Sequence, residues 1–180
     1  MLDNIVQDLP VGLRYFAFRF LLFGLRKGDT RMKDANRRSV ERIFRDAPFI
    51  HSLGIELTSC GKGWCETRVK GVPSLRQQHG FIHAGALMTL ADHTCGGAAA
   101  STVPEDRDVI TVENKVSFLR PALGPELICR AEVLRAGTNL VFVEAEVMVE
   151  SAGGRMMVAK ASSTLAVVPL NTKPGGELGT

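Results

Sequence analysis

The sequence predicts an α+β fold in which a curved antiparallel sheet, of about five or six strands, wraps around one central helix. Two observations predict it. From residue 53 onward, apolar and polar residues alternate in several short stretches, as in strands with one solvated face. Residues 83–100 instead contain no Lys, Arg or Glu and only one acidic residue. A helix that is apolar on every side has to be buried on every side, and a sheet that curves around it provides that burial.

The alternating stretches define the expected strands. Residues 53–58 and 65–70 flank the turn-like run Gly61-Lys62-Gly63, which predicts a hairpin. Further strands are expected over residues 110–118, 127–133, 141–149 and 156–168. In the first of these, the apolar residues share one parity and are expected on one face of the sheet; they are Ile110, Val112, Val116 and Phe118.

The central helix is expected to begin near Ala84 or Gly85, after the hairpin. Its residues are mostly Ala and Gly, whose small side chains let another backbone approach closely. The predicted order of elements is therefore β–β–α–β–β–β–β. This arrangement of strands around one helix is called the hotdog fold.

Residues 1–47 are expected to form a basic helical arm, residues 48–170 the hotdog domain, and residues 171–180 a flexible tail. Within the arm, residues 10–27 predict an amphipathic helix that is too interrupted by arginines to span a membrane. Residues 39–47 predict a second helix. The apolar face of the first helix has two alternative roles. It packs on the hotdog domain or on another subunit, or it contacts a membrane surface.

Charge and cysteine content narrow the functional classes. Residues 51–180 hold twelve Lys and Arg against thirteen Asp and Glu, and the chain has one Trp and one Tyr, which argues against nucleic-acid binding. No secretory signal is visible, so we expect a cytoplasmic protein, with peripheral contact to the inner face of a membrane as the alternative. The cysteines are expected to be free and buried; a cross-strand pair of Cys60 and Cys65 is the alternative.

Asp92 is the first candidate for chemistry, because it is the one acidic residue of the apolar helix. Burial of an ionised carboxylate is unfavourable unless the group is paired or functional, and no cation lies three or four residues away. Desolvation raises the pKa of a carboxyl group, which suits a general base or a nucleophile. A structural carboxylate bonded to the backbone of a loop is the alternative.

The run from Gln77 to Gly85 directly precedes this helix and is the second candidate. The first N–H groups of a helix are free donors at a positive end, so they can polarise a carbonyl and hold an oxyanion. Asp92 lies about two turns further along the helix and is out of reach of a carbonyl held there. We therefore expect a partner subunit to complete the site.

The four-residue spacing of His79 and His83 raises the question of a metal site. Two histidines at this spacing bind zinc when both lie on one regular helix. Gly80 between them, and a helix start near Ala84, argue against such a site, so we expect no metal and no other cofactor. His93 is either functional or an ordinary buried histidine.

Two stretches resemble a known family. The pattern His83-Ala-Gly-x4-Leu90-Ala91-Asp92, preceded by Gln77-x-x-Gly80-x-x-His83, resembles the signature of the PaaI-like acyl-CoA thioesterases, a branch of the hotdog superfamily. The run Ile110-Thr111-Val112 through Phe118-Leu119-Arg120-Pro121-Ala122 is similar to a later segment of that family. The resemblance covers roughly residues 48–168.

The resemblance implies roles for the matching residues. Asp92 matches the catalytic carboxylate, which activates water or attacks the thioester carbonyl. Ala84 and Gly85 match a glycine pair whose backbone N–H polarises that carbonyl, although Ala84 departs from the commoner glycine. Gln77 matches a residue that positions substrate or water, and Thr111 one that helps to orient the water. His83 matches the motif histidine, and family members assemble as dimers or tetramers with sites between subunits.

We therefore expect an acyl-CoA thioesterase that hydrolyses a fatty or aryl acyl-CoA to the free acid and CoA, as a homodimer or homotetramer. Substrate contacts are expected at His79, Gly80, Phe81 and Met88, and an apolar tunnel is expected between helix and sheet, lined by Phe81, Met88 and Phe142. Two alternatives remain. One is a non-catalytic acyl-CoA-binding or regulatory module on the same fold. The other is a protein whose main function is membrane association through residues 10–27, with the hotdog domain serving mainly for assembly.

Overall fold

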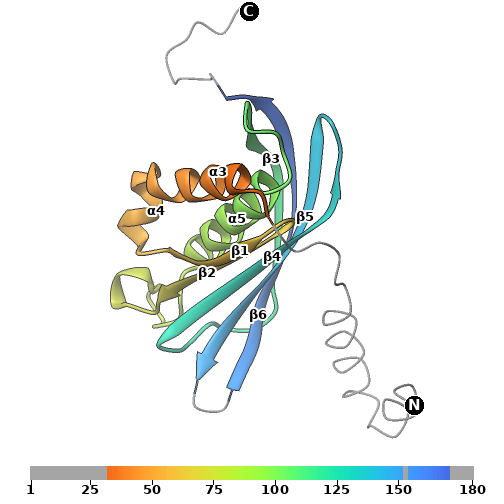
Figure 1. Ribbon diagram of the computed structural model, residues 1–180. Helices are drawn as coiled ribbons and strands as arrows, with labels where there is room; N and C mark the ends of the chain where they lie inside the picture. The colour runs from red at the N-terminus through yellow and green to blue at the C-terminus, as the bar shows by residue number, and fades with distance from the viewer. Residues whose placement is uncertain (1–31, 152–153, 171–180) are drawn as a thin grey trace, which may run out of the picture. The chain divides into compact units, whose positions relative to one another are not determined.

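The computed structural model describes residues 32–151 and 154–170, which belong to one compact unit. Two helices come first, α3 (Asp34–Arg45) and α4 (Pro48–Leu53), and the central helix α5 (Ala84–Ala100) follows the first hairpin (Figure 1). A single 3-10 turn, η1, spans Pro73–Leu75. The strands are β1 (Glu56–Gly61), β2 (Trp64–Lys70), β3 (Arg107–Phe118), β4 (Glu126–Ala136), β5 (Leu140–Ser151) and β6 (Gly154–Pro169).

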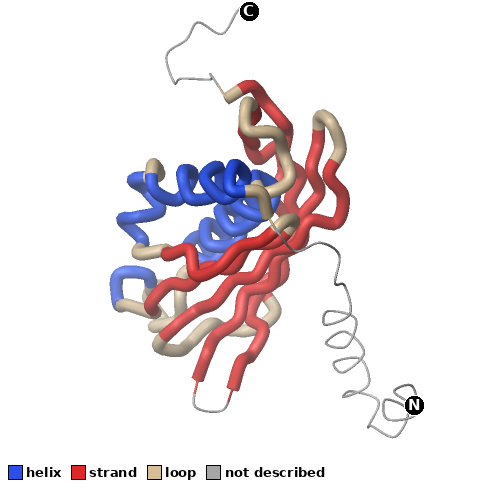
Figure 2. The backbone as a smooth tube through the Cα atoms, viewed as in Figure 1, coloured by secondary structure: helices blue, strands red, loops and turns tan. Residues whose placement is uncertain are grey.

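The strands form one antiparallel sheet in the order β1-β2-β4-β5-β6-β3. The helices lie together on one side of this sheet (Figure 2), and α5 packs against every strand of it. The predicted order of elements and the curved sheet around one helix are confirmed. Because β1 and β3 end the order, β3 has no neighbouring strand on its outer side within residues 32–151 and 154–170.

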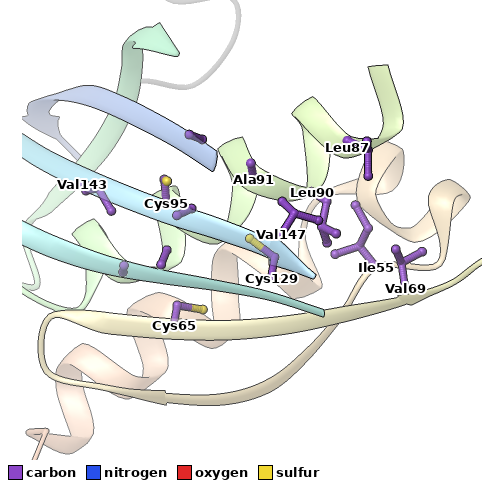
Figure 3. Close-up of a cluster of buried hydrophobic side chains, with 14 of the residues drawn as sticks. Ile55, Cys65, Val69, Leu87, Leu90, Ala91, Cys95, Cys129, Val143 and Val147 are labelled. Atoms are coloured by element: carbon purple, nitrogen blue, oxygen red, sulfur yellow. The ribbon is translucent and has the colours of Figure 1, made fainter. Parts of the chain in front are cut away.

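The core lies between α5 and the inner face of the sheet (Figure 3). Leu90, Ala91 and Cys95 of α5 are fully buried there, as the apolar composition of the helix predicts. The inner side of β5 also alternates as predicted, with five buried residues that are Val141, Val143, Ala145, Val147 and Val149.

Helix α3 packs against α5 and against the edge strand β1. It contributes Val40 and Phe44 to the core, although the sequence prediction assigns residues 1–47 to the arm. Two ion pairs tie it to the segment after α5: Arg38 with Glu105 at 2.8 Å and Arg42 with Asp108 at 3.2 Å. The predicted helix over residues 39–47 is therefore real, but it begins at Asp34 and is packed on the domain.

The expected strand over residues 53–58 begins later than predicted. Pro48 occupies the first turn of α4, a favoured position for proline, and this short helix runs to Leu53. Gly54 ends it with a φ of 72°, in the left-handed region that favours glycine. Strand β1 starts only at Glu56. Three alternating residues are too few to distinguish a strand from the end of a helix.

The expectation that the apolar residues of β3 all lie on one face of the sheet is wrong. A β-bulge between Thr111 and Glu113 adds one residue to this strand, so the side chains after it change faces relative to those before it. Ile110 and Val112 are more than half exposed, whereas Val116 packs against the core. A bulge leaves no mark in the alternation that could be recognised beforehand.

Several expectations concern residues that lie outside the described part of the chain. These are the amphipathic helix over residues 10–27 and the flexible tail over residues 171–180. Among the helices that are described, none combines the length and the apolar character needed to cross a membrane.

We predict that Gly97→Ala destabilises the fold, whereas Gly96→Ala does not. A Cβ at position 97 would lie 2.7 Å from Cys65 Sγ and 3.1 Å from Phe44 Cε2, both buried, so we expect a loss of about 1–2 kcal/mol in the free energy of unfolding. At position 96 the nearest atom is Ile43 Cδ1 at 3.9 Å, so the better helix propensity of Ala adds up to about 1 kcal/mol. Urea denaturation of both variants measures the difference; equal stabilities would contradict this packing.

Candidate active site

The start of α5 leaves one backbone donor free. His83 caps the helix, because its Nδ1 accepts a hydrogen bond of 2.9 Å from the N–H of Gly85. The N–H groups of Ala86 and Leu87 bond to the carbonyl of His83. Among the described residues, the Ala84 N–H donates no hydrogen bond. This group is therefore the available donor at the positive end of the helix.

The cap also explains the glycine at position 85. A Cβ there would lie 3.1 Å from His83 Nδ1, close enough to disturb the bond between the histidine and the Gly85 N–H. The sequence prediction treats Ala84 and Gly85 together as the donor pair. In the structure the two differ, because the Gly85 N–H is used within the helix cap and the Ala84 N–H is not.

Gln77 is held by the tight loop that leads into the helix. Its backbone N–H donates to the Phe81 carbonyl at 2.8 Å, and its side-chain carbonyl accepts from the His79 N–H. Gly80 has a φ of 86°, which this turn requires. Since the side-chain oxygen of Gln77 is used inside the loop, its NH2 group is the end available to a ligand.

Asp92 lies half-buried on α5, facing β3. The Thr111 hydroxyl of β3 donates to Asp92 Oδ1 at 3.0 Å. Burial raises the pKa of the Asp92 carboxyl, and the hydrogen bond from Thr111 opposes part of that rise. The structure thus brings together Asp92 and Thr111 in an environment that makes the carboxylate a stronger base than one in water.

An open pocket of about 510 Å³ lies beside the start of α5. One side is formed by Gln77, Gln78 and residues 81–84, the other by residues 118–122, and Leu87 also lines it. The two sides are joined by a hydrogen bond of 2.9 Å from the Ile82 N–H to the Ala122 carbonyl. The pocket therefore places apolar side chains next to the free N–H of Ala84.

The predicted substrate contacts divide between the pocket and other places. Phe81 lines the pocket, as do Gln77, His83 and Ala84 from the catalytic set. His79, Gly80 and Met88 do not line it, and Met88 is 42% exposed on α5. Phe142 does not line a tunnel between helix and sheet, because its position in β5 alternates with the buried valines and its side chain is exposed on the outer face.

Sequence reasoning missed the second side of the pocket. Phe118 is predicted as a strand residue, and Leu119, Arg120 and Pro121 enter the sequence analysis within a resemblance; the structure places all four in the lining. A signal was present, because Leu119, Arg120 and Pro121 directly follow a predicted strand and belong to no predicted element. What the sequence does not contain is the pairing of this run with the loop before α5.

The remaining ionisable groups near α5 have structural roles. Burial lowers the pKa of His93 to about 4, so its ring is neutral at pH 7, and it packs edge-on against Phe44 with ring centroids 4.5 Å apart. Burial raises the pKa of the Cys95 thiol to about 12, which makes it a poor nucleophile. All four cysteines are free, and no group of metal-binding side chains exists within the described ranges.

Comparison with known proteins identifies the family. A family model described as the thioesterase superfamily matches residues 79–159, which include the helix start, Asp92 and Thr111. The crystal structure of a thioesterase family protein from Silicibacter pomeroyi is 34% identical, with a TM-score of 0.73, and the match covers 74% of this chain and 98% of that one. This chain belongs to the thioesterase superfamily. It is a thioester hydrolase with the hotdog fold.

The chain is also similar to two proteins of Escherichia coli. The medium/long-chain acyl-CoA thioesterase YigI of Escherichia coli (strain K12) is 27% identical over 135 residues, which are 67% of this chain and 85% of YigI. The PaaI protein of Escherichia coli, from the phenylacetic acid degradation operon, is 18% identical with a TM-score of 0.68, covering 77% of this chain and 96% of PaaI. This second likeness shows the same fold.

We predict that Thr111→Val moves the acidic limb of the kcat/KM profile to higher pH. Removal of the hydroxyl removes the hydrogen bond that lowers the pKa of Asp92, so this pKa rises further. Activity that needs the ionised carboxylate is present above that pKa and lost below it, so the loss begins at a higher pH. Thr111→Ser keeps the hydroxyl and should keep the wild-type profile; a Val variant with an unshifted limb would show that the bond does not tune Asp92.

Proposed function

We propose that this thioesterase hydrolyses acyl-CoA thioesters to the free acid and CoA, with no cofactor. The observation that carries the proposal is the free Ala84 N–H at the positive end of α5, at the edge of an apolar pocket. A thioester carbonyl bound to this donor would have its developing negative charge stabilised during attack by water. The name of YigI, a medium/long-chain acyl-CoA thioesterase, supports a fatty acyl chain as the group that enters the pocket.

The carboxylate that acts on this carbonyl comes from a second subunit. Ala84 and Asp92 are eight residues apart on one rigid helix, so they lie about 12 Å apart along its axis. One Asp92 therefore cannot reach a carbonyl that its own Ala84 holds. In a twofold dimer, the same pair of groups meets twice, with the donor from one subunit and the carboxylate from the other.

The surface of the chain supports such a dimer. On the side of α5 next to β3, a stripe of residues spaced four apart consists of the exposed Ala84 and Met88 and the half-buried Asp92. Next to it, no strand of the described part of the chain pairs with the outer edge of β3. A second copy placed on this stripe would cover Met88, pair the two β3 edges and complete both sites; we propose a homodimer of this kind, alone or as half of a homotetramer.

Each group then has one task in hydrolysis. The Ala84 N–H and the NH2 group of Gln77 hold the carbonyl, the first as the oxyanion donor. The partner's Asp92 accepts a proton from water as the water attacks the carbonyl carbon, and Thr111 of that same partner subunit fixes the carboxylate. Collapse of the tetrahedral intermediate breaks the C–S bond, and CoA leaves as the thiolate, which takes up the proton.

We predict that Ala84→Pro abolishes most of the activity without unfolding the helix. Proline is favoured at the first helical position, and His83, with φ of −64° and ψ of 139°, already has the backbone conformation that precedes proline. The substitution replaces the proposed donor with the CH2 group of the proline ring, so kcat should fall by about 10²–10³. Thiol release from a panel of acyl-CoAs measures it. Ala84→Gly keeps the N–H and should retain activity; a fully active proline variant would remove the Ala84 N–H from the mechanism.

We predict that two inactive variants restore activity when their subunits mix. Asp92→Asn removes the carboxylate and Ala84→Pro the donor, so in a mixed dimer one site carries both defects and the other carries neither. Equal co-expression should then give about a quarter of the wild-type rate, since half of the dimers are mixed and each has one intact site. Asp106→Asn, at an exposed carboxylate, is the control that should stay active by itself.

No recovery in verified mixed dimers would show that both groups act within one subunit. Wild-type protein that binds acyl-CoA but releases no thiol would instead favour the alternative of a non-catalytic acyl-CoA-binding module.

A further inference from the structure

The pocket beside α5 is backed by a second apolar space that is closed. This apolar gap lies between the first half of α5, the end of α4, β2 and β4, and its lining side chains are all apolar, including Ile55, Val69 and Leu90. It is too tight to hold a water molecule. Figure 3 shows Ile55, Val69, Leu87 and Leu90 gathered at this end of the core.

Two residues line both spaces. Ile82 and Leu87 are the only side chains shared by the pocket and the gap, and they are 5% and 4% exposed. Ile82 is fixed by the hydrogen bond of its N–H to the Ala122 carbonyl, and Leu87 by its place in the first turns of α5. These two side chains form the floor of the pocket and separate it from the apolar gap; we call them the inner wall.

The polarity of the pocket decides which end of the substrate meets this inner wall. A carbonyl at the Ala84 N–H carries the acyl chain on one side and the sulfur of CoA on the other. Gln78 and Arg120, at the rim, are exposed and polar, which suits the amides and phosphates of CoA. The floor is buried and apolar, which suits hydrocarbon. The acyl chain therefore points toward Ile82 and Leu87.

We propose that Ile82 and Leu87 set the longest acyl chain that the enzyme accepts, with Leu87 as the main determinant. This inference rests on the proposed acyl-CoA thioesterase function. The terminal methyl of the preferred chain contacts the inner wall, and a longer chain has to displace two well-packed side chains to enter the apolar gap. Truncation of Leu87 joins the pocket to the gap, which is lined by apolar groups and accepts further methylenes.

The test is the chain-length profile of kcat/KM for the full-length protein, from acetyl-CoA to palmitoyl-CoA. For wild type, kcat/KM should rise by up to about fourfold per methylene, which corresponds to about 0.8 kcal/mol per buried methylene, and then fall once the chain reaches the inner wall. For Leu87→Ala the optimum should move to chains longer by about two or three methylenes, matching the carbons removed. Ile82→Val, a smaller change, should move it in the same direction by less.

Leu90→Ala is the matched control. Leu90 lines the apolar gap but not the pocket, and it is fully buried one turn further along the same helix. The same leucine-to-alanine change there creates a cavity of similar size behind the inner wall, so it should lower stability while the optimal chain length stays that of wild type. If Leu87→Ala does not fold, Leu87→Val replaces it, with a smaller shift expected in the same direction.

The outcomes separate this inference from the proposed function. An optimum that shifts with Leu87 and Ile82 but not with Leu90 supports the inner wall. An active wild type whose optimum is the same in the Leu87 variants, or moves equally in Leu90→Ala, overturns the inner wall and leaves the thioesterase function standing. A wild type that releases no thiol from any acyl-CoA overturns the proposed function itself.

Discussion

The need to bury α5 on all its sides determines the rest of this structure. With Asp92 as its only acidic residue and no basic residue other than histidine, the helix loses stabilisation wherever its surface meets water. The sheet curves around one side of α5 and α3 covers another. Gly97 lets the side chains of Cys65 and Phe44 pack closely against the helix. Ala84 and Met88 stay exposed on this helix, and the proposed second subunit would cover them.

Rigidity of the same helix separates the parts of the site. A helix start supplies donors but cannot bend to meet a side chain two turns away. A carboxylate placed nearer the start would lie beside the donor that must bind an oxyanion, and the two negative charges would repel each other. In the proposed dimer, the Asp92 carboxylate of one chain and the Ala84 N–H of the other approach the carbonyl from different directions. The separation of about 12 Å between Ala84 and Asp92 along one helix is then compatible with catalysis.

Patterns along the chain predicted what depends on local periodicity. The order of strands and central helix along the chain, the start of α5 and the choice of Asp92 as a candidate follow from alternation, composition and one exceptional charge. The bulge after Thr111 and the outward position of Phe142 depend on how strands pair, which periodicity does not contain. The distinction between the N–H groups of Ala84 and Gly85 needed the side chain of His83 in place.

That distinction also accounts for the alanine at position 84. In the proposed mechanism, two demands act on the pair of residues after His83: the N–H of Gly85 satisfies the histidine cap, and the N–H of Ala84 stays free for a ligand. Close contact with His83 Nδ1 favours glycine at position 85, where a Cβ would lie 3.1 Å from that atom. Position 84 has to supply a backbone N–H at the first helical residue, which every residue except proline does. The methyl group of Ala84 therefore leaves the donor intact and changes only the shape of the pocket beside it.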